Sequence, residues 1–134
     1  MNEEEWANVL EALSQSDASV AATAAEQLHR QATAEDLHRL RQLLNEGDAF
    51  AREAAAWPIS EIVGPSSLCE LLIAYQRGLD EGLDNDGFTT ALVELVAGDP
   101  LGCRDALLLL AQSESAALRE NADWLLDFCT PEGS

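Results

Sequence analysis

Hydrophobic residues recur at intervals of three and four along almost the whole chain, which is the spacing that gives an α-helix one apolar face. The first such face carries Trp6, Val9, Leu10 and Leu13. Polar capping residues and helix breakers interrupt the pattern at short distances, and no segment alternates as a half-buried strand does. The pattern therefore predicts an all-α fold of eight helices without a sheet.

The helix boundaries are predicted from these caps and breakers. The first four helices are expected to start after Asn2, Asp17, Thr33 and Asp48, and the second to fourth to end near Gln31, Gly47 and Gly64. The other four are expected to start at Ser66 or Ser67, Phe88, Pro100 and Ser115, and the fifth, sixth and eighth to end near Gly78, Ala97 and Cys129. Thr33 and Asp36 have the spacing of a capping box. Pairing successive helices gives four hairpins.

One segment of the chain occurs twice. Residues of AREAAAWPISEIVGP (Ala51–Pro65) recur in LRENADWLLDFCTP (Leu118–Pro131) at a constant distance of 67 positions. The matched pairs are Arg52 and Arg119, Glu53 and Glu120, Ala55 and Ala122, and Trp57 and Trp124. This distance is about twice the 30–40 residues of a helical hairpin repeat, so it predicts a stack in which the two segments belong to the second and fourth hairpins.

The repeated segment resembles the second helix of a HEAT repeat, in which an aliphatic residue and an arginine precede small residues and a glycine-containing aliphatic ending. The matching residues are Ala51, Arg52, Ala55, Ala56, Ile59, Ile62 and Gly64, and in the later copy Leu118, Arg119, Ala122 and Leu126. The chain departs from the pattern at Ala21, at Thr89 or Thr90, and at Pro58, which we expect to kink its helix. The resemblance implies an α-α superhelix that binds another protein.

The composition predicts one domain over residues 1–134. With 47% hydrophobic residues, the chain can bury one continuous core. No apolar run approaches the roughly 20 residues that span a bilayer, and the first residues, MNEEEW, are acidic where a secretory signal would be basic and then apolar. Cys69, Cys103 and Cys129 lack the spacing of a metal site. We therefore expect a cytoplasmic protein with three buried free thiols.

The chain is strongly acidic. It has 25 acidic residues against seven basic ones, all of them arginine, and its formal net charge is −18. Such a surface repels nucleic acid and anionic lipid, because proteins bind both through cations that displace counterions. The charged partner to expect is a basic protein. The competing interpretation is that the acidity only keeps the protein soluble.

In a stack of hairpins, one side of the second helices stays exposed and forms a concave surface. The family resemblance places there Glu26, Glu53, Trp57, Glu61, Glu94, Glu120, Asp123 and Trp124, together with Arg30 and Phe128. An acidic groove with two tryptophans suits arginine or lysine side chains, which pair with carboxylates and lie over aromatic faces. The competing interpretation is that Trp57 and Trp124 belong to the core, where tryptophan is usually mostly buried.

A predicted ten-residue polar loop, Gly78–Gly87, is long for a connection between paired helices. Its Asp80, Glu81 and Asp84 are a second candidate contact with the partner, since functional contacts concentrate in loops. The alternative is that the loop is a tolerated insertion without a role. It cannot form an EF-hand, because residues without a side-chain oxygen would fall at the first and last ligand positions.

No set of residues predicts catalysis, a cofactor or a metal site. His29 and His38 lie on different predicted helices, and the HExxH, P-loop, GxSxG and GxGxxG motifs are absent. The chain also lacks lysine, which excludes a Schiff base. We therefore expect a binding protein that is not an enzyme.

Two functions fit a small, acidic, helical binding protein. The first is an inhibitor, such as the immunity partner of a bacterial toxin with a basic active-site surface, because complementary charge gives fast and specific binding. The second is an assembly or scaffold adaptor in a larger complex. HEAT-like enzymes, such as DNA glycosylases and pigment lyases, form a third class. The net charge argues against DNA, and no residue set argues for a lyase.

Overall fold

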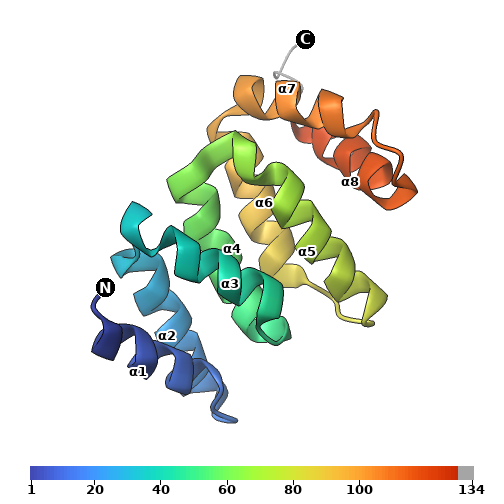
Figure 1. The fold of residues 1–134 in the computed structure, drawn as a ribbon. Helices are drawn as coiled ribbons and strands as arrows, with labels where there is room; N and C mark the ends of the chain where they lie inside the picture. Colours follow the sequence, from blue (N-terminus) through green and yellow to red (C-terminus); the bar gives the residue numbers. More distant parts are fainter. Residues whose placement is uncertain (130–134) are drawn as a thin grey trace. The chain divides into compact units, whose positions relative to one another are not determined.

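The structure is a computed structural model that describes residues 1–129. These residues form helices and turns without a strand, which confirms the all-α prediction for this part of the chain (Figure 1). They divide into two compact units, residues 1–62 and the residues from 63 onward. The boundary falls beside the last residue of α4 (Ala49–Val63).

The first unit begins with α1 (Glu3–Leu13) and α2 (Ala18–Gln31). A short 3₁₀ segment, η1 (Ala34–Asp36), precedes α3 (Leu37–Glu46), and α4 follows after Asp48. The predicted starts after Asn2, Asp17, Thr33 and Asp48 are confirmed, with the difference that the turn after Thr33 is 3₁₀ rather than α-helical.

Hydrogen bonds within a few residues explain these helix starts. Asn2 Oδ1 accepts a bond from the Glu5 N–H at 2.7 Å, and the Asn2 N–H donates to Glu5 Oε1 at 3.2 Å. Asp48 Oδ1 likewise accepts from the Ala51 N–H at 2.9 Å. Each bond satisfies a backbone donor that has no partner inside the helix. Because the contacts are local, the sequence pattern alone predicts them.

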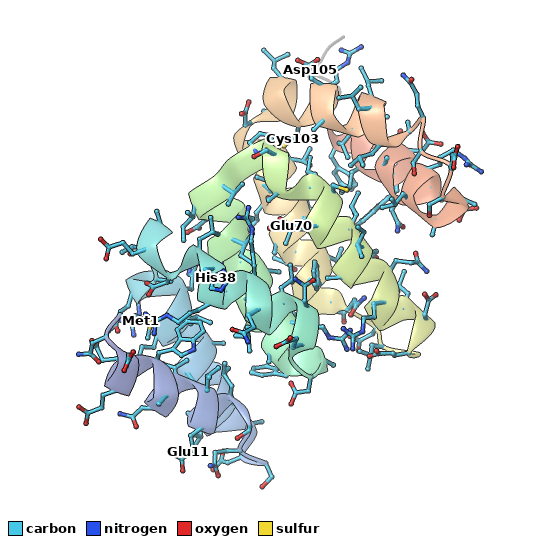
Figure 2. All side chains as sticks on the ribbon, in the orientation of Figure 1. Met1, Glu11, His38, Glu70, Cys103 and Asp105 are labelled. Atoms are coloured by element: carbon cyan, nitrogen blue, oxygen red, sulfur yellow. The ribbon has the colours of Figure 1, made fainter. Side chains whose placement is uncertain are left out.

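Asp36 does more than cap a helix, because it also connects η1 and α3 to the amino terminus. Its Oδ2 accepts from the Thr33 N–H at 2.9 Å and lies 3.2 Å from the Met1 ammonium, while Oδ1 accepts from Arg39 Nη2 at 2.9 Å. Figure 2 shows Met1 at the start of α1. Burial raises the pKa of Asp36, but the three donors outweigh it and hold the pKa below its ordinary value of 3.8.

The core of the first unit follows the predicted apolar faces. Its buried hydrophobic residues are Val9, Leu13, Ala21, Ala24, Leu28, Leu40, Leu44, Ala51, Ala54, Ala55, Ala56 and Ile59. Pro58 is buried inside α4, and the helix continues through it. Proline has no N–H to donate to the carbonyl four residues earlier, so one backbone bond of α4 is missing there. The kink expected at Pro58 stays a prediction.

The second unit contains η2 (Gly64–Ser67), α5 (Leu68–Asp80), α6 (Asp86–Gly98), α7 (Pro100–Leu110), α8 (Ala116–Leu126) and η3 (Asp127–Cys129). The predicted starts at Pro100 and Ser115 are confirmed. The Asp99 side chain caps α7, and Ser115 Oγ accepts from the Leu118 N–H at 3.3 Å. Both caps satisfy donors in the first turn, as in the first unit.

The prediction of a ten-residue loop after Gly78 is wrong. α5 continues past Gly78 to Asp80, and α6 starts at Asp86 rather than after Gly87, so residues 81–85 connect the two helices. Gly78 resembles a helix end in the sequence because glycine commonly terminates helices. In the structure it is instead a buried residue within α5.

Asn85 explains why α5 carries a glycine at this place. It is buried, has a left-handed backbone with φ of 58°, and its Nδ2 donates to the Tyr75 carbonyl at 2.7 Å. A Cβ on Gly78 would lie 2.6 Å from Asn85 Nδ2, so only glycine leaves room for the amide. Asparagine also tolerates the left-handed region better than most residues. The short connection therefore depends on a contact between its last residue and α5.

α5 buries one apolar face, formed by Leu68, Leu71, Leu72 and Tyr75. Its orientation places residue 69 outward, and Cys69 is accordingly exposed, contrary to the prediction of a buried thiol. No helix within residues 1–129 is both long enough and apolar enough to cross a bilayer.

Cys103 and Cys129 are buried as predicted. Burial, with Cys129 and Asp99 nearby, raises the pKa of Cys103 to about 11. Burial also raises the pKa of Cys129, against the lowering influence of Arg104. Both thiols therefore stay protonated at neutral pH, which makes them poor nucleophiles.

Candidate partner-binding site

The residues predicted for the site divide between the two units. Glu26, Glu53, Trp57 and Glu61 belong to the first, and Asp80, Glu81, Asp84, Glu94, Glu120, Asp123 and Trp124 belong to the second. Each unit contains one of the two predicted tryptophans, so these are described in turn.

Trp57 and Trp124 occupy the same position in their helices. Each lies nine residues after the residue that caps its helix, Asp48 for α4 and Ser115 for α8. The 67-residue recurrence therefore corresponds to matched places on two helices, as predicted. The preceding arginines differ, because Arg52 is buried whereas Arg119 is exposed. The matched residues therefore share their positions along the two helices, but they are not always equally buried.

Trp57 lies on the surface of the first unit with one ring face covered. Its ring stacks on His29 of α2 with centroids 4.4 Å apart, and the side chain is 39% exposed. The interpretation of Trp57 as a core residue is therefore wrong. Glu61, one helical turn further along α4, is exposed and lies 2.8 Å from His29 Nε2.

The contact between His29 and Glu61 is close without being a well-aligned hydrogen bond. The oxygen lies within ion-pair distance of Nε2, but the ring N–H has no acceptor along its own direction. The pair is a cation–carboxylate contact whenever the ring is protonated.

Trp124 is half-buried in a cluster of four rings in the second unit, which we call the ring cluster: Phe88, Tyr75, Trp124 and Phe128. The Trp124 ring stacks on Tyr75 of α5 at 5.6 Å and meets Phe128 edge-on at 6.1 Å. Tyr75 and Phe88 are buried, whereas Phe128 is 45% exposed. The cluster therefore runs from the core of the unit to its surface.

Carboxylates flank both tryptophans along their helices. Glu53 lies one turn before Trp57 and Glu120 one turn before Trp124, a spacing that puts the side chains on the same helix face. Glu53 is half-buried and engaged within the molecule, whereas Glu120 is exposed. Neither helix has a basic residue in its last turn. Trp124 lies two residues before the end of α8, where the negative end of the helix dipole is not offset, whereas Trp57 lies six residues before the end of α4.

Asp123 and Asp127 add negative charge beside Trp124. Both are exposed, and within residues 1–129 neither forms an ion pair. Arg119 is not bonded to either of them, because its Nη1 donates to the backbone carbonyls of Ser113 and Glu114 at 2.7 and 3.1 Å. Carboxylates therefore outnumber arginines on α8 around Trp124.

The three predicted loop residues are exposed but already have partners within the chain. Asp80 is helical and accepts from Gln76 Nε2 at 2.9 Å, and Glu81 lies 3.2 Å from Arg77 Nε. Asp84 Oδ1 accepts from the Asp86 N–H at 3.1 Å at the start of α6. A role of these three residues in binding a partner stays a prediction.

The remaining predicted residues are exposed. Glu26 and Arg30 lie on α2, and Glu94 lies on α6. Within the described part of the chain, no three His, Cys, Asp or Glu side chains are arranged to hold a metal ion.

Sequence analysis missed His29 and Tyr75 as parts of the site. Each stacks on one of the tryptophans, and each stands on a different helix from its tryptophan. Only the packing of α2 with α4, and of α5 with α8, reveals these pairs, because no local spacing encodes them.

No family model, curated protein or solved structure matches this chain.

Proposed function

We propose that this protein is a binding protein without catalysis that covers a basic surface of another protein. Cationic side chains of that partner lie over Trp57 and Trp124 in this proposal. One observation carries it: two tryptophans at matched positions stay partly exposed, each with a glutamate one turn before it and no basic residue in the last turn of its helix. The arrangement of the helices as HEAT-like hairpins in a superhelix is part of the same proposal.

The physical basis is the combination of an aromatic face with nearby carboxylates, of which Glu61, Glu120 and Asp123 are exposed. A cation over an exposed tryptophan gains about 0.5–1 kcal/mol, and about 2 kcal/mol once the contact is desolvated. A net charge of −18 adds long-range attraction that speeds the encounter with a basic protein. Paired charges at the rim contribute mainly to the association rate and to specificity. These properties suit a protein that must find and cover a partner quickly.

The favoured biological role is inhibition, as an immunity protein that neutralises a basic toxin. An inhibitor needs only to cover a site with complementary charge, which is what the two tryptophans and their carboxylates support. The alternative role is an adaptor in a larger complex, for which Leu101 and Leu109, exposed on α7, offer further contact surface.

The decisive experiment compares three charge reversals in quantitative affinity capture from the native host. Glu61→Lys and Glu120→Lys place a cation beside each tryptophan, and Glu11→Lys makes the same charge change on α1 (Figure 2). A basic protein captured by the wild type and by Glu11→Lys, but lost with both other variants, would support the proposal. Titration of that protein should then show about a tenfold or greater weakening for each site variant.

Equal capture by all four proteins would overturn the site. The two roles are separated by expressing the captured protein in cells with and without this chain. Toxicity that this chain relieves indicates an inhibitor, whereas a stable complex without toxicity indicates an adaptor.

A further inference from the structure

A hollow in the second unit lies beside the ring cluster, between α5 and α8. It measures about 270 Å³ and is lined by Ile73, Gln76, Arg77 and Asp80 from α5, by Ala117 and Leu118 from α8, and by Ser115, which caps α8. Ile73 is 55% exposed, although its side chain is fully apolar. The wall formed by Ile73, Ala117 and Leu118 is therefore an apolar surface that water reaches, which is the condition under which covering it is favourable.

The hollow and the ring cluster belong to one surface. Gln76 Oε1 accepts from Asn121 Nδ2 at 3.0 Å, which joins the two helices between the hollow and the Tyr75–Trp124 pair. Along α8, Leu118 and Trp124 are six residues apart, a distance of about 9 Å at the helical rise. A bound helical peptide with one side chain in the hollow can therefore place another side chain, about two turns away along the peptide, beside Trp124.

The polar groups of this surface accept hydrogen bonds and attract cations. Asp80 lines the hollow and accepts from Gln76 Nε2 at 2.9 Å. Arg77 also lines it and is paired with Glu81 at 3.2 Å, so the negative charge of this surface comes from the excess of carboxylates over arginines in the unit. The chain after Gly64 carries 13 acidic residues and three arginines. A second copy of this chain would therefore be repelled, whereas a basic segment would be attracted.

We infer that the groove between α5 and α8 binds an amphipathic basic helix of the partner, with an aliphatic side chain in the hollow and an arginine over Trp124 and Phe128. This inference rests on the proposed function and adds the chemistry of the bound segment. The aliphatic anchor follows from the exposed wall, and the arginine follows from the ring face beside Glu120 and Asp123. Helical spacing of about two turns between anchor and arginine matches the spacing along α8.

The test uses two synthetic 15-residue helical peptides and the full chain. The first peptide has a central leucine and an arginine seven residues away on each side, so that either direction of binding satisfies the site. The second peptide differs only in having alanine at the centre. We expect the full chain to bind the leucine peptide about ten times more tightly in fluorescence anisotropy, because a leucine buries several more methylene groups than an alanine.

Two protein variants locate the binding. Ile73→Gln removes the exposed wall and should abolish the preference for leucine, while Leu101→Gln changes an even more exposed apolar residue on α7 and should keep it. Glu120→Lys should weaken both peptides alike, since it acts on the arginine. Circular dichroism melting of each variant checks that the fold is retained.

The possible results separate the inference from the proposed function. Equal affinity for both peptides, with both weakened by Glu120→Lys, would overturn the hydrophobic anchor and leave the acidic aromatic site standing. A leucine preference that survives Ile73→Gln would place the anchor elsewhere and overturn the inference. Binding of neither peptide would overturn both. If the wild type self-associated in sedimentation experiments and Ile73→Gln abolished this, the groove would bind a second copy of the chain. That result would also overturn the inference.

Discussion

Asp36 is the residue whose role differs most from its appearance in the sequence. As the third residue after Thr33 it resembles a simple capping acid, yet its side chain is 1% exposed and contacts the Met1 ammonium. Arg39 completes the site by donating to Asp36 and to the Met1 carbonyl, and its guanidinium lies 4.9 Å from the Trp6 ring centre. One carboxylate therefore holds together the start of the chain, η1 and α3.

We predict that Asp36→Asn lowers the free energy of unfolding by about 3–5 kcal/mol at neutral pH, because it leaves a buried ammonium without its counter-ion. The pKa of Asp36 is lowered in the folded state, so its stabilisation is present above the ordinary value of 3.8 and is lost as the pH falls through the lower folded value. Urea unfolding should therefore show a large difference from wild type near pH 7 and a small one near pH 2.5.

Glu35→Gln is the matched control for this prediction. Glu35 is the neighbouring carboxylate in η1 and is exposed, so its substitution should change the unfolding free energy by less than about 0.5 kcal/mol. If Asp36→Asn were equally mild at pH 7, the buried contact with Met1 would not stabilise the fold.

At the scale of elements, the connection between α5 and α6 depends on one close approach. Asn85 occupies the space beside Gly78 and bonds the Tyr75 carbonyl, so the connection needs only residues 81–85. The same α5 then presents Tyr75 to Trp124. The end of α5 and the stacking of Tyr75 on Trp124 therefore depend on the same short stretch of the helix.

We predict that Gly78→Ala destabilises the protein by about 1–3 kcal/mol in spite of the better helix propensity of alanine, because the new methyl group must displace Asn85. Thermal unfolding followed by circular dichroism measures the effect. Gly98→Ala is the control, since a Cβ at the last residue of α6 meets nothing within 4 Å. A Gly78→Ala protein as stable as the Gly98→Ala protein would contradict the close approach.

At the scale of the whole molecule, self-repulsion between carboxylates opposes folding. The 25 acidic residues face only seven arginines, and Arg119 and Arg39 are among those held by specific contacts. A high net charge of one sign destabilises a compact state but keeps it soluble and speeds association with an oppositely charged protein. The acidity that would attract a partner is therefore expected to reduce stability.

We predict that the melting temperature at pH 8 rises as sodium chloride increases from about 20 to 300 mM, since the screening length shrinks several-fold over this range. Replacing Glu3, Glu11 and Glu114 by glutamine should raise the melting temperature at low salt and flatten the response, because these exposed carboxylates add to the repulsion. A flat or falling response of the wild type would show that self-repulsion is unimportant.

The candidate site could be predicted only in part. Local spacing was enough to place Glu120 and Trp124 one turn apart on α8 and to match Trp57 with Trp124. It could not show that His29 covers one face of Trp57 or that Tyr75 stacks on Trp124, because these partners come from other helices. The exposed Ile73 likewise has no distinguishing mark in the sequence, where it continues an apolar stretch.

The sequence by itself determined the all-α class and most helix starts, because a cap such as that of Ser115 on Leu118 joins residues that are already neighbours along the chain. Only the tertiary structure decided which residues approach one another closely and which side chains are buried. Gly78 looks like a helix end until Asn85 is seen against it, and Asp36 looks solvated until Met1 is seen beside it. The reason is that burial and close approach depend on residues from distant segments, which local pattern cannot place.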